Sequence, residues 1–241
     1  MVELEEPVVL YIKFSSNKDW LNSFALGNWY LNSAEFFKKL EEQSGKRGQG
    51  DKNELQYNIS FGKITAFDPK TKKEIFTSKF SNGKVFNKFD KKLPIFCITG
   101  IKASSLIKIR EENGKNIYKL PFSDDELLFI KKNFGNYCAV VQSNAFHKRL
   151  NDFSQRYPVL FSDIKYVDEF NKDKALAFLN FTNDRFFFKD IDLSYQREFR
   201  LCIFSKMTDN HIFKTEPFTT DECCIGEVDM LKKTELIIIN E

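Results

Sequence analysis

The sequence predicts an α+β protein, and three observations support this prediction. Short runs of β-branched and aromatic residues, each about the length of one strand, recur along the chain from residue 8 onward. Three or four other segments show a helix cap followed by apolar residues at helical spacing. Strands and helices do not alternate as they do in βαβ units, so a parallel, doubly wound sheet is not expected.

The composition indicates one folded domain over residues 1–241. The chain is 42% hydrophobic and 29% charged, and it shows no internal repeat, low-complexity tract or Pro/Gly/Ser-rich linker. Its 37 basic and 34 acidic residues give a net charge of +3. This small excess disfavours a general polyanion binder but allows a local basic patch.

We expect a cytoplasmic protein without membrane contact. No apolar run approaches the roughly 20 residues needed to span a bilayer, and the acidic start, MVELEE, lacks the apolar core of an export signal. The five cysteines are an odd number without CxxC spacing, which favours a reducing compartment over a disulfide framework. The two histidines, His147 and His211, are far apart in sequence, so no metal site is expected.

The first 42 residues predict two strands and two helices. They are a strand over 8–14, a helix over 19–26 that Gly27 ends, an extended segment over 29–31 and a helix over 33–42. Asn32 with Glu35 three residues later suits a variant of the capping box at the start of the second helix.

The polar, glycine-rich stretch 44–53 predicts a loop. Gly45 and Gly50 have GxxxxG spacing, but Asp51 and Lys52 follow where a P-loop needs Lys and Ser/Thr, and a helix precedes the stretch instead of a strand. We therefore expect a solvated, mobile connector rather than a phosphate-binding loop.

The middle of the chain predicts strands over 55–67, 74–80, 84–89 and 93–100. Asn82-Gly83 lies between two of these runs, and Asn-Gly is a strong signal for a two-residue hairpin turn. We expect the chain to reverse at residues 81–83.

The second half predicts two further helices among short strands. Ser123 and Glu126 form a capping box that opens a helix to about residue 133. Ser143 begins another, in which Phe146, Leu150, Phe153 and Tyr157 recur at helical spacing. The expected strands are 136–142, 164–167, 198–204 and 236–239.

The tripeptide Gln196-Arg197-Glu198 is the first candidate for chemistry. Alternation of side chains in extended backbone places Gln196 and Glu198 on one face. A carboxamide beside a carboxylate can hold two hydroxyl groups, or a hydroxyl group and a nucleophile. The competing interpretation is that Glu198 and Arg200 form an ion pair on a wet sheet face.

Three further residues could bind a ligand. Alternation in the first strand puts Tyr11 and Lys13 on one face, opposite Ile12, so Lys13 is either solvated or directed at a ligand. Thr99 places a small hydroxyl group at the end of a buried strand, where it could also serve as an ordinary polar cap.

The order of segments resembles a family of uncharacterised phage- and prophage-encoded proteins over about residues 8–205. The matching segments are 10–14 (LYIKF), 27–33 (GNWYLNS), 35–37 (EFF), 47–54 (RGQGDKNE), 134–141 (FGNYCAVV), Phe146 with Arg149, 164–168 (IKYVD), 187–189 (FFK) and 195–200 (YQREFR). That pattern is in turn distantly similar to the ADP-ribosyltransferase superfamily, which includes toxins that modify DNA.

This resemblance implies a split, mostly antiparallel β core with three to five helices that binds NAD. Gln196-Arg-Glu198 matches the family's Gln/Glu-x-Glu motif, with Glu198 as the catalytic carboxylate and Gln196 orienting the acceptor. Thr99 would be the hydroxyl of a middle strand. Lys13, or Tyr11, would stand where the family has Arg or His, and Lys supplies charge without the bidentate fork of Arg.

Two functions follow from these patterns. The first is an NAD-dependent ADP-ribosyltransferase-like protein of a mobile element or phage-conflict system, acting on a nucleic-acid or protein acceptor. The alternative is a non-enzymatic mobile-element protein that binds and inhibits a host or phage protein. The first requires Lys13, Thr99 and Glu198 to converge in one cleft, and the second predicts a large exposed apolar patch.

Overall fold

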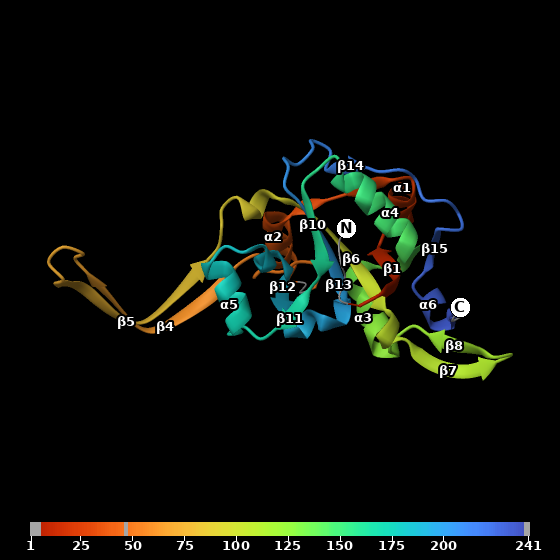
Figure 1. Ribbon diagram of the computed structural model, residues 1–241, viewed down its shortest axis with the longest axis horizontal. Helices are drawn as coiled ribbons and strands as arrows, with labels where there is room; N and C mark the ends of the chain where they lie inside the picture. The colour runs from red at the N-terminus through yellow and green to blue at the C-terminus, as the bar shows by residue number, and fades with distance from the viewer. Residues whose placement is uncertain (1–5, 46–47, 239–241) are drawn as a thin grey trace.

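The computed structural model describes residues 6–45 and 48–238, without the side chains of residues 60, 61, 64, 80 and 81 (Figure 1). The predicted segment 44–53 therefore has two residues, 46 and 47, outside the described part, as has residue 239 of the last predicted strand.

The core is an antiparallel sheet in the order β10-β13-β6-β1-β9-β15, with the short β3 also paired to β6. Its strands are β10 (Val159–Asp163), β13 (Glu198–Ile203), β6 (Pro94–Lys102), β1 (Val8–Ser15), β9 (Tyr137–Gln142), β15 (Cys223–Glu227) and β3 (Asn32–Ser33). Neighbours in this order pair antiparallel throughout, so the prediction of an α+β protein with a mostly antiparallel core is confirmed.

Four helices form where the sequence predicted them, namely α1 (Lys18–Ala25), α2 (Ala34–Ser44), α3 (Asp124–Phe134) and α4 (Ser143–Ser154). The sequence did not predict α5 (Lys172–Leu179) or the single turn α6 (Met230–Lys233). Ser123 and Glu126 form the predicted reciprocal capping box of α3. The cap of α2 is Ser33 and not Asn32, because the Ser33 hydroxyl accepts the backbone N–H of Phe36.

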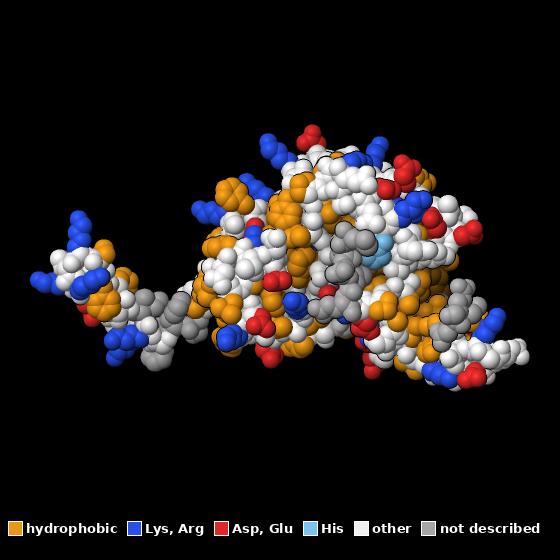
Figure 2. Space-filling view, viewed as in Figure 1, with side chains coloured by type: hydrophobic (Ala, Val, Ile, Leu, Met, Phe, Trp, Pro, Cys, Tyr) orange, Lys and Arg blue, Asp and Glu red, His pale blue; other side chains and the backbone are white. Residues whose placement is uncertain are grey.

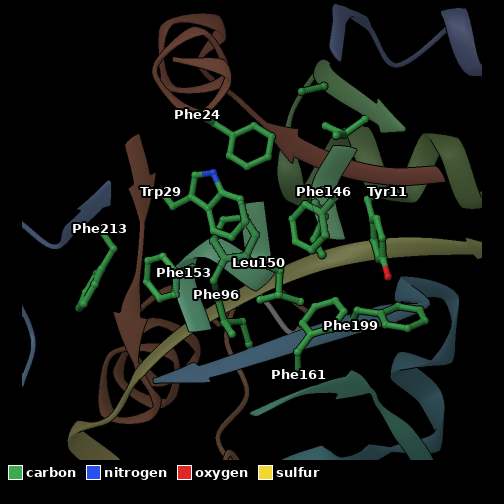
Figure 3. Packing of buried hydrophobic residues seen from close by; sticks show 14 of the residues in the cluster. Tyr11, Phe24, Trp29, Phe96, Phe146, Leu150, Phe153, Phe161, Phe199 and Phe213 are labelled. Atoms are coloured by element: carbon green, nitrogen blue, oxygen red, sulfur yellow. The ribbon is translucent and has the colours of Figure 1, made fainter. Parts of the chain in front are cut away.

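One face of the sheet packs against α1 and α4 through a cluster of aromatic rings (Figure 3). The Trp29 ring stacks on Phe96 and on Phe146, with a centroid distance of 5.1 Å in each case. Burying an aromatic side chain of this kind stabilises a fold by about 1.5–3 kcal/mol. The abundance of Phe in the sequence therefore supplies this core.

The opposite face of the sheet is also covered. Ile12 and Ile101 pack against Leu127 and Ile130 of α3 in one cluster. A second cluster joins Ile95 and Cys202 to Ala34 of α2 and to Leu55 and Phe186. All six residues of β13 are consequently buried. The ion pair of Glu198 with Arg200 in the competing interpretation does form, but its wet sheet face is wrong.

The central sheet opens between β1 and β6. These strands pair from Val8 with Lys102 to Ile12 with Thr99. Beyond Ile12, β1 continues on β9 as far as Ser15, while the rest of β6 continues on β13. Cys97 and Lys13 therefore lie on strands that have separated, which leaves room for a cavity.

The predicted hairpin turn at 81–83 is wrong. Strand β4 (Tyr57–Phe67) pairs with β5 (Glu74–Val85), and Asn82 and Gly83 lie within β5, opposite Ser60 and Ile59. The chain reverses at 68–73 because the Asp68 carboxylate accepts the backbone N–H groups of Lys70 and Thr71, at 2.8 Å each. This hairpin, the arm (residues 57–85), projects away from the body of the molecule (Figure 1).

Smaller sheets surround this core. A sheet at one end contains β7 (Ile107–Glu112), β8 (Lys115–Lys119) and β16 (Glu235–Ile238). Two-stranded pairs join β2 (Asn28–Tyr30) to β14 (Ile212–Lys214) and β11 (Lys165–Val167) to β12 (Phe188–Asp190). The 3₁₀ segments are η1 (Asp90–Lys92), η2 (Ala103–Ser105), η3 (Asn183–Phe187) and η4 (Ile191–Gln196).

All five cysteines are free thiols. Among the described residues, no helix is both long and apolar enough to cross a membrane.

Candidate active site

A cavity of about 200 Å³ lies where β1 and β6 separate. Its walls come from β1, β6, β13, α2, α3 and the segment 48–54. Lys13, Thr99, Gln196 and Glu198 all line it. The structure therefore brings together four of the five residues that the sequence singles out, from positions spread over most of the chain.

Glu198 is the first residue of β13 and is 5% exposed. Lys189 Nζ donates to its Oε2 at 2.5 Å, and Arg200 Nε donates to its Oε1 at 3.1 Å. Burial acts to raise the pKa of this carboxyl group, but Lys189 and Arg200 outweigh burial and hold the pKa at about 2. Glu198 is thus a fixed negative charge at neutral pH.

Gln196 ends η4 beside Glu198. Its Oε1 accepts a hydrogen bond from Lys189 Nζ at 3.1 Å, so one ammonium group bridges the carboxamide and the carboxylate. Arg197 between them has a left-handed backbone, with φ of 45°. The predicted side-by-side arrangement of Gln196 and Glu198 is therefore confirmed, although a turn rather than a strand produces it.

The segment 48–54 closes over Gln196. Gln196 Nε2 donates to the carbonyl oxygen of Gly48 at 3.0 Å. Gly48 has φ of +106°, and a Cβ atom there would lie 2.4 Å from the hydroxyl oxygen of Tyr195. Only glycine tolerates both this backbone conformation and this close approach.

Thr99 pairs with Glu198 across β6 and β13, as expected for a hydroxyl on a middle strand. Its Oγ1 donates to the carbonyl oxygen of Gln196 at 2.8 Å. This bond fixes the turn that carries Gln196, and the threonine still faces the cavity.

Lys13 crosses the opening between the separated strands. Its Nζ donates to the carbonyl oxygen of Cys97 at 2.6 Å and lies 4.4 Å from the centroid of the Phe96 ring. Burial lowers the pKa of Lys13, while the neighbouring Cys97 and Glu198 act in the opposite direction. Lys13 therefore lies at the cavity and does not extend freely into solvent.

Tyr11 does not line the cavity. It is 0% exposed and packs in the aromatic cluster, with its ring centroid 4.5 Å from that of Phe146 (Figure 3). Its hydroxyl group is hydrogen-bonded to His147 Nε2 at 3.0 Å. Tyr11 and Lys13 leave β1 on the same face, but only Lys13 lies beyond the point where β1 and β6 separate.

The sequence did not assign Asp51 and Glu54 to the site of Lys13, Thr99 and Glu198. Asp51 and Glu54 line the cavity and are each 5% exposed, so the prediction of a solvated connector over this segment is wrong. Burial, with a contribution from Glu54, raises the pKa of Asp51 to about 7, although Lys189 opposes this shift. A carboxyl group with this pKa exchanges protons at physiological pH.

Arg200 anchors Glu54 from the far side of the cluster. It is 0% exposed, and its Nη1 lies 2.7 Å from Glu54 Oε1. Lys189 and Arg200 thus balance Glu54 and Glu198 in a charge cluster removed from water. Fixed charges in such surroundings interact more strongly with a reacting group than they would in water.

No group of three or more His, Cys, Asp or Glu side chains that could hold a metal ion occurs within residues 6–45 and 48–238. Comparison of the chain with family models, with curated proteins and with solved structures finds no match.

Proposed function

We propose that this chain is an NAD-dependent ADP-ribosyltransferase-like protein of a mobile element or phage-conflict system, with a nucleic acid or protein as acceptor. The observation that carries the proposal is the convergence of Lys13, Thr99, Gln196 and Glu198 on one cavity. The separation of β1 from β6, which creates this cavity, is consistent with the split core that the sequence resemblance implies.

NAD supplies an ADP-ribosyl group when the bond between its nicotinamide nitrogen and ribose C1′ breaks, the electron pair leaving with nicotinamide. Positive charge develops on the ribose, and the ionised Glu198 is placed to stabilise it. An ionised carboxylate has about four acceptor positions. Lys189 occupies a position on Oε2, which leaves that oxygen able to accept a ribose hydroxyl group.

Asp51 is suited to act as the general base. Its pKa of about 7 allows it to accept the proton of the acceptor's hydroxyl or amino group as that group bonds to C1′. The carboxyl groups of Asp51 and Glu198 have pKa values far apart, and such pairs mark a division between proton transfer and charge stabilisation.

The cavity fits the reacting end of the dinucleotide. Small-molecule sites typically enclose about 300–1,000 Å³, so a volume of about 200 Å³ suits the nicotinamide and its ribose rather than the whole molecule. Leu40 and Ile130 give it an apolar wall for the nicotinamide ring. Lys13, whose Nζ lies at the opening between the strands beside the carbonyl oxygen of Cys97, would contact the adjoining phosphates.

Release of nicotinamide by the purified protein, with cell lysate as the source of acceptor, tests the proposal. Glu198→Gln should reduce turnover by about 100-fold or more, as removal of one stabilising group typically does. Glu216→Gln, at an exposed position outside the cavity, is the matched control and should retain full turnover.

Glu198→Gln also leaves Lys189 and Arg200 with one partner fewer, so its melting temperature must be measured alongside. Asp51→Asn separates the two effects, because it removes the general base without breaking an ion pair of the cluster. Wild-type protein that neither releases nicotinamide nor binds NAD in calorimetry would overturn the proposal.

A second candidate is the non-enzymatic binding protein, which one observation favours. Apolar side chains around α5 are exposed, namely Phe170 (68%), Leu176 (45%), Leu179 (52%) and Phe181 (53%). A gathering of this kind is typical of a surface that meets another protein. Calorimetry separates the two candidates, because this one predicts no heat on titration with NAD.

A further inference from the structure

The arm carries the entire positive excess of the chain. Residues 57–85 contain six lysines and two acidic residues, a net charge of +4, whereas the rest of the chain has 31 basic and 32 acidic residues, a net charge of −1. The six are Lys63, Lys70, Lys72, Lys73, Lys79 and Lys84, and all are exposed. Blue side chains accordingly surround the far end of the arm (Figure 2).

These lysines are not neutralised within the protein. In the part of the chain that the structure describes, none of the six forms an ion pair, although the body contains many. The Asp68 carboxylate at the tip accepts backbone N–H groups that form the turn. The ammonium groups of the arm are therefore available to an anionic partner.

The positions of Lys63 and Lys79 destabilise the arm. Lys63 lies directly opposite Lys79 in the antiparallel register. Directly opposed side chains have Cβ atoms about 4.5–5.5 Å apart, and like charges at such positions destabilise a hairpin. A two-stranded hairpin is only marginally stable in water, so repulsion between two of its side chains is unfavourable for the folded arm. An anion between the two ammonium groups would relieve it.

We infer that the arm binds the backbone of duplex DNA. A two-stranded ribbon fits the major groove, which is about 12 Å wide, and an 11-residue strand is about 36 Å long, close to one turn of the double helix. Lys63 and Lys79 face the phosphates together with the hydroxyl pair of Thr65 and Thr77, whose oxygens lie 2.8 Å apart.

Other partners fit this surface less well. Duplex RNA has a deep, narrow major groove that side chains cannot enter. Single strands are held in concave basic grooves, whereas the arm is a projecting ribbon. Pairing with the arm of a second copy would bring together two surfaces that each have a net charge of +4, and these repel each other. This binding does not depend on the NAD chemistry proposed above.

Fluorescence anisotropy with a labelled DNA duplex of about 24 base pairs, without NAD and between about 50 and 200 mM salt, tests the inference. Each phosphate contact contributes about −0.9 to the slope of log K against log salt, so four or five contacts predict a slope of about −4. Lys63→Gln with Lys79→Gln should make this slope shallower by about 1.8 and weaken binding.

Lys18→Gln with Lys148→Gln removes the same charge from exposed positions on α1 and α4, and should leave the slope unchanged. The arm variant should melt no lower than wild type, because a repulsive pair has been removed. Equal losses in the two variants, no binding at low salt, or tighter binding to single-stranded DNA, duplex RNA or polyglutamate would overturn the inference.

Discussion

Replacing Arg200 by Met should severely destabilise the fold. Arg200 is 0% exposed and donates to Glu198, to Glu54 and to the carbonyl oxygen of Phe186. Glu198 would retain Lys189, but Glu54 would lose its only ion-pair partner among the described residues. Removing one member of a buried ion pair typically costs about 3–5 kcal/mol. For a chain of this size that corresponds to a melting temperature lower by roughly 6–20 °C.

Urea unfolding followed by tryptophan fluorescence measures this change. Trp29 is 0% exposed in the aromatic cluster and reports on unfolding, whereas Trp20 is already 67% exposed in the folded protein. Adding Glu54→Gln to the Arg200→Met variant removes the stranded charge and should restore at least about 1 kcal/mol. An Arg200→Met protein within about 1 kcal/mol of wild type would refute the idea of a tightly coupled, buried charge cluster.

Two further predictions concern the segment 48–54. Because the folded state raises the pKa of Asp51 from 3.8 to about 7, its protonated form stabilises the fold below pH 4, and this stability is lost as pH rises to about 7. Asp51→Asn should therefore stabilise the protein at pH 8 by up to about 4 kcal/mol and change its stability little at pH 3.5. Urea unfolding at the two pH values measures this difference. Equal effects at both pH values would count against a buried Asp51. Gly48→Ala should cost about 1–3 kcal/mol through its left-handed backbone and its approach to Tyr195, whereas Gly62→Ala, with open space around it, should be neutral in the same assay.

The sequence predicted most accurately those features that depend on interactions between residues close together in the chain. The capping box of α3 forms between residues three positions apart, so Ser123 and Glu126 were sufficient to locate it. The alternation in β13 was likewise visible, because Phe199 and Leu201 pack on one face while Glu198 and Arg200 lie on the other. Burial of that second face depends on segments distant in the chain and could not be predicted.

The turn of the arm shows two local signals in competition. Asn82-Gly83 suits a two-residue turn, but Asp68-Pro69 forms a turn that the Asp68 carboxylate closes with two backbone hydrogen bonds. The second signal also lets β4 and β5 pair along their full length. Comparing the number of strand pairs that each turn allows would have favoured Asp68.

The sequence could not predict that Glu54 and Arg200 belong to the candidate site, and the reason is physical. Glu54 and Arg200 are 146 positions apart, and their ion pair forms only when the segment 48–54 folds onto the sheet. Glycines and polar residues in this segment resemble those of a solvated loop. The residue in the sequence that could have indicated this ion pair is Arg200. It is a charged residue in the middle of a strand whose neighbours are almost all apolar.

The most direct test of the account is a calorimetric titration of the wild-type protein with NAD, beside a Leu40→Trp variant. Leu40 lines the cavity from α2 and is itself uncharged, so a larger ring there fills the cavity without removing a member of the charge cluster. We expect one NAD bound per chain by the wild type and at least about 10-fold weaker binding by the variant. No binding by the wild type, or equal binding by both proteins, would contradict it.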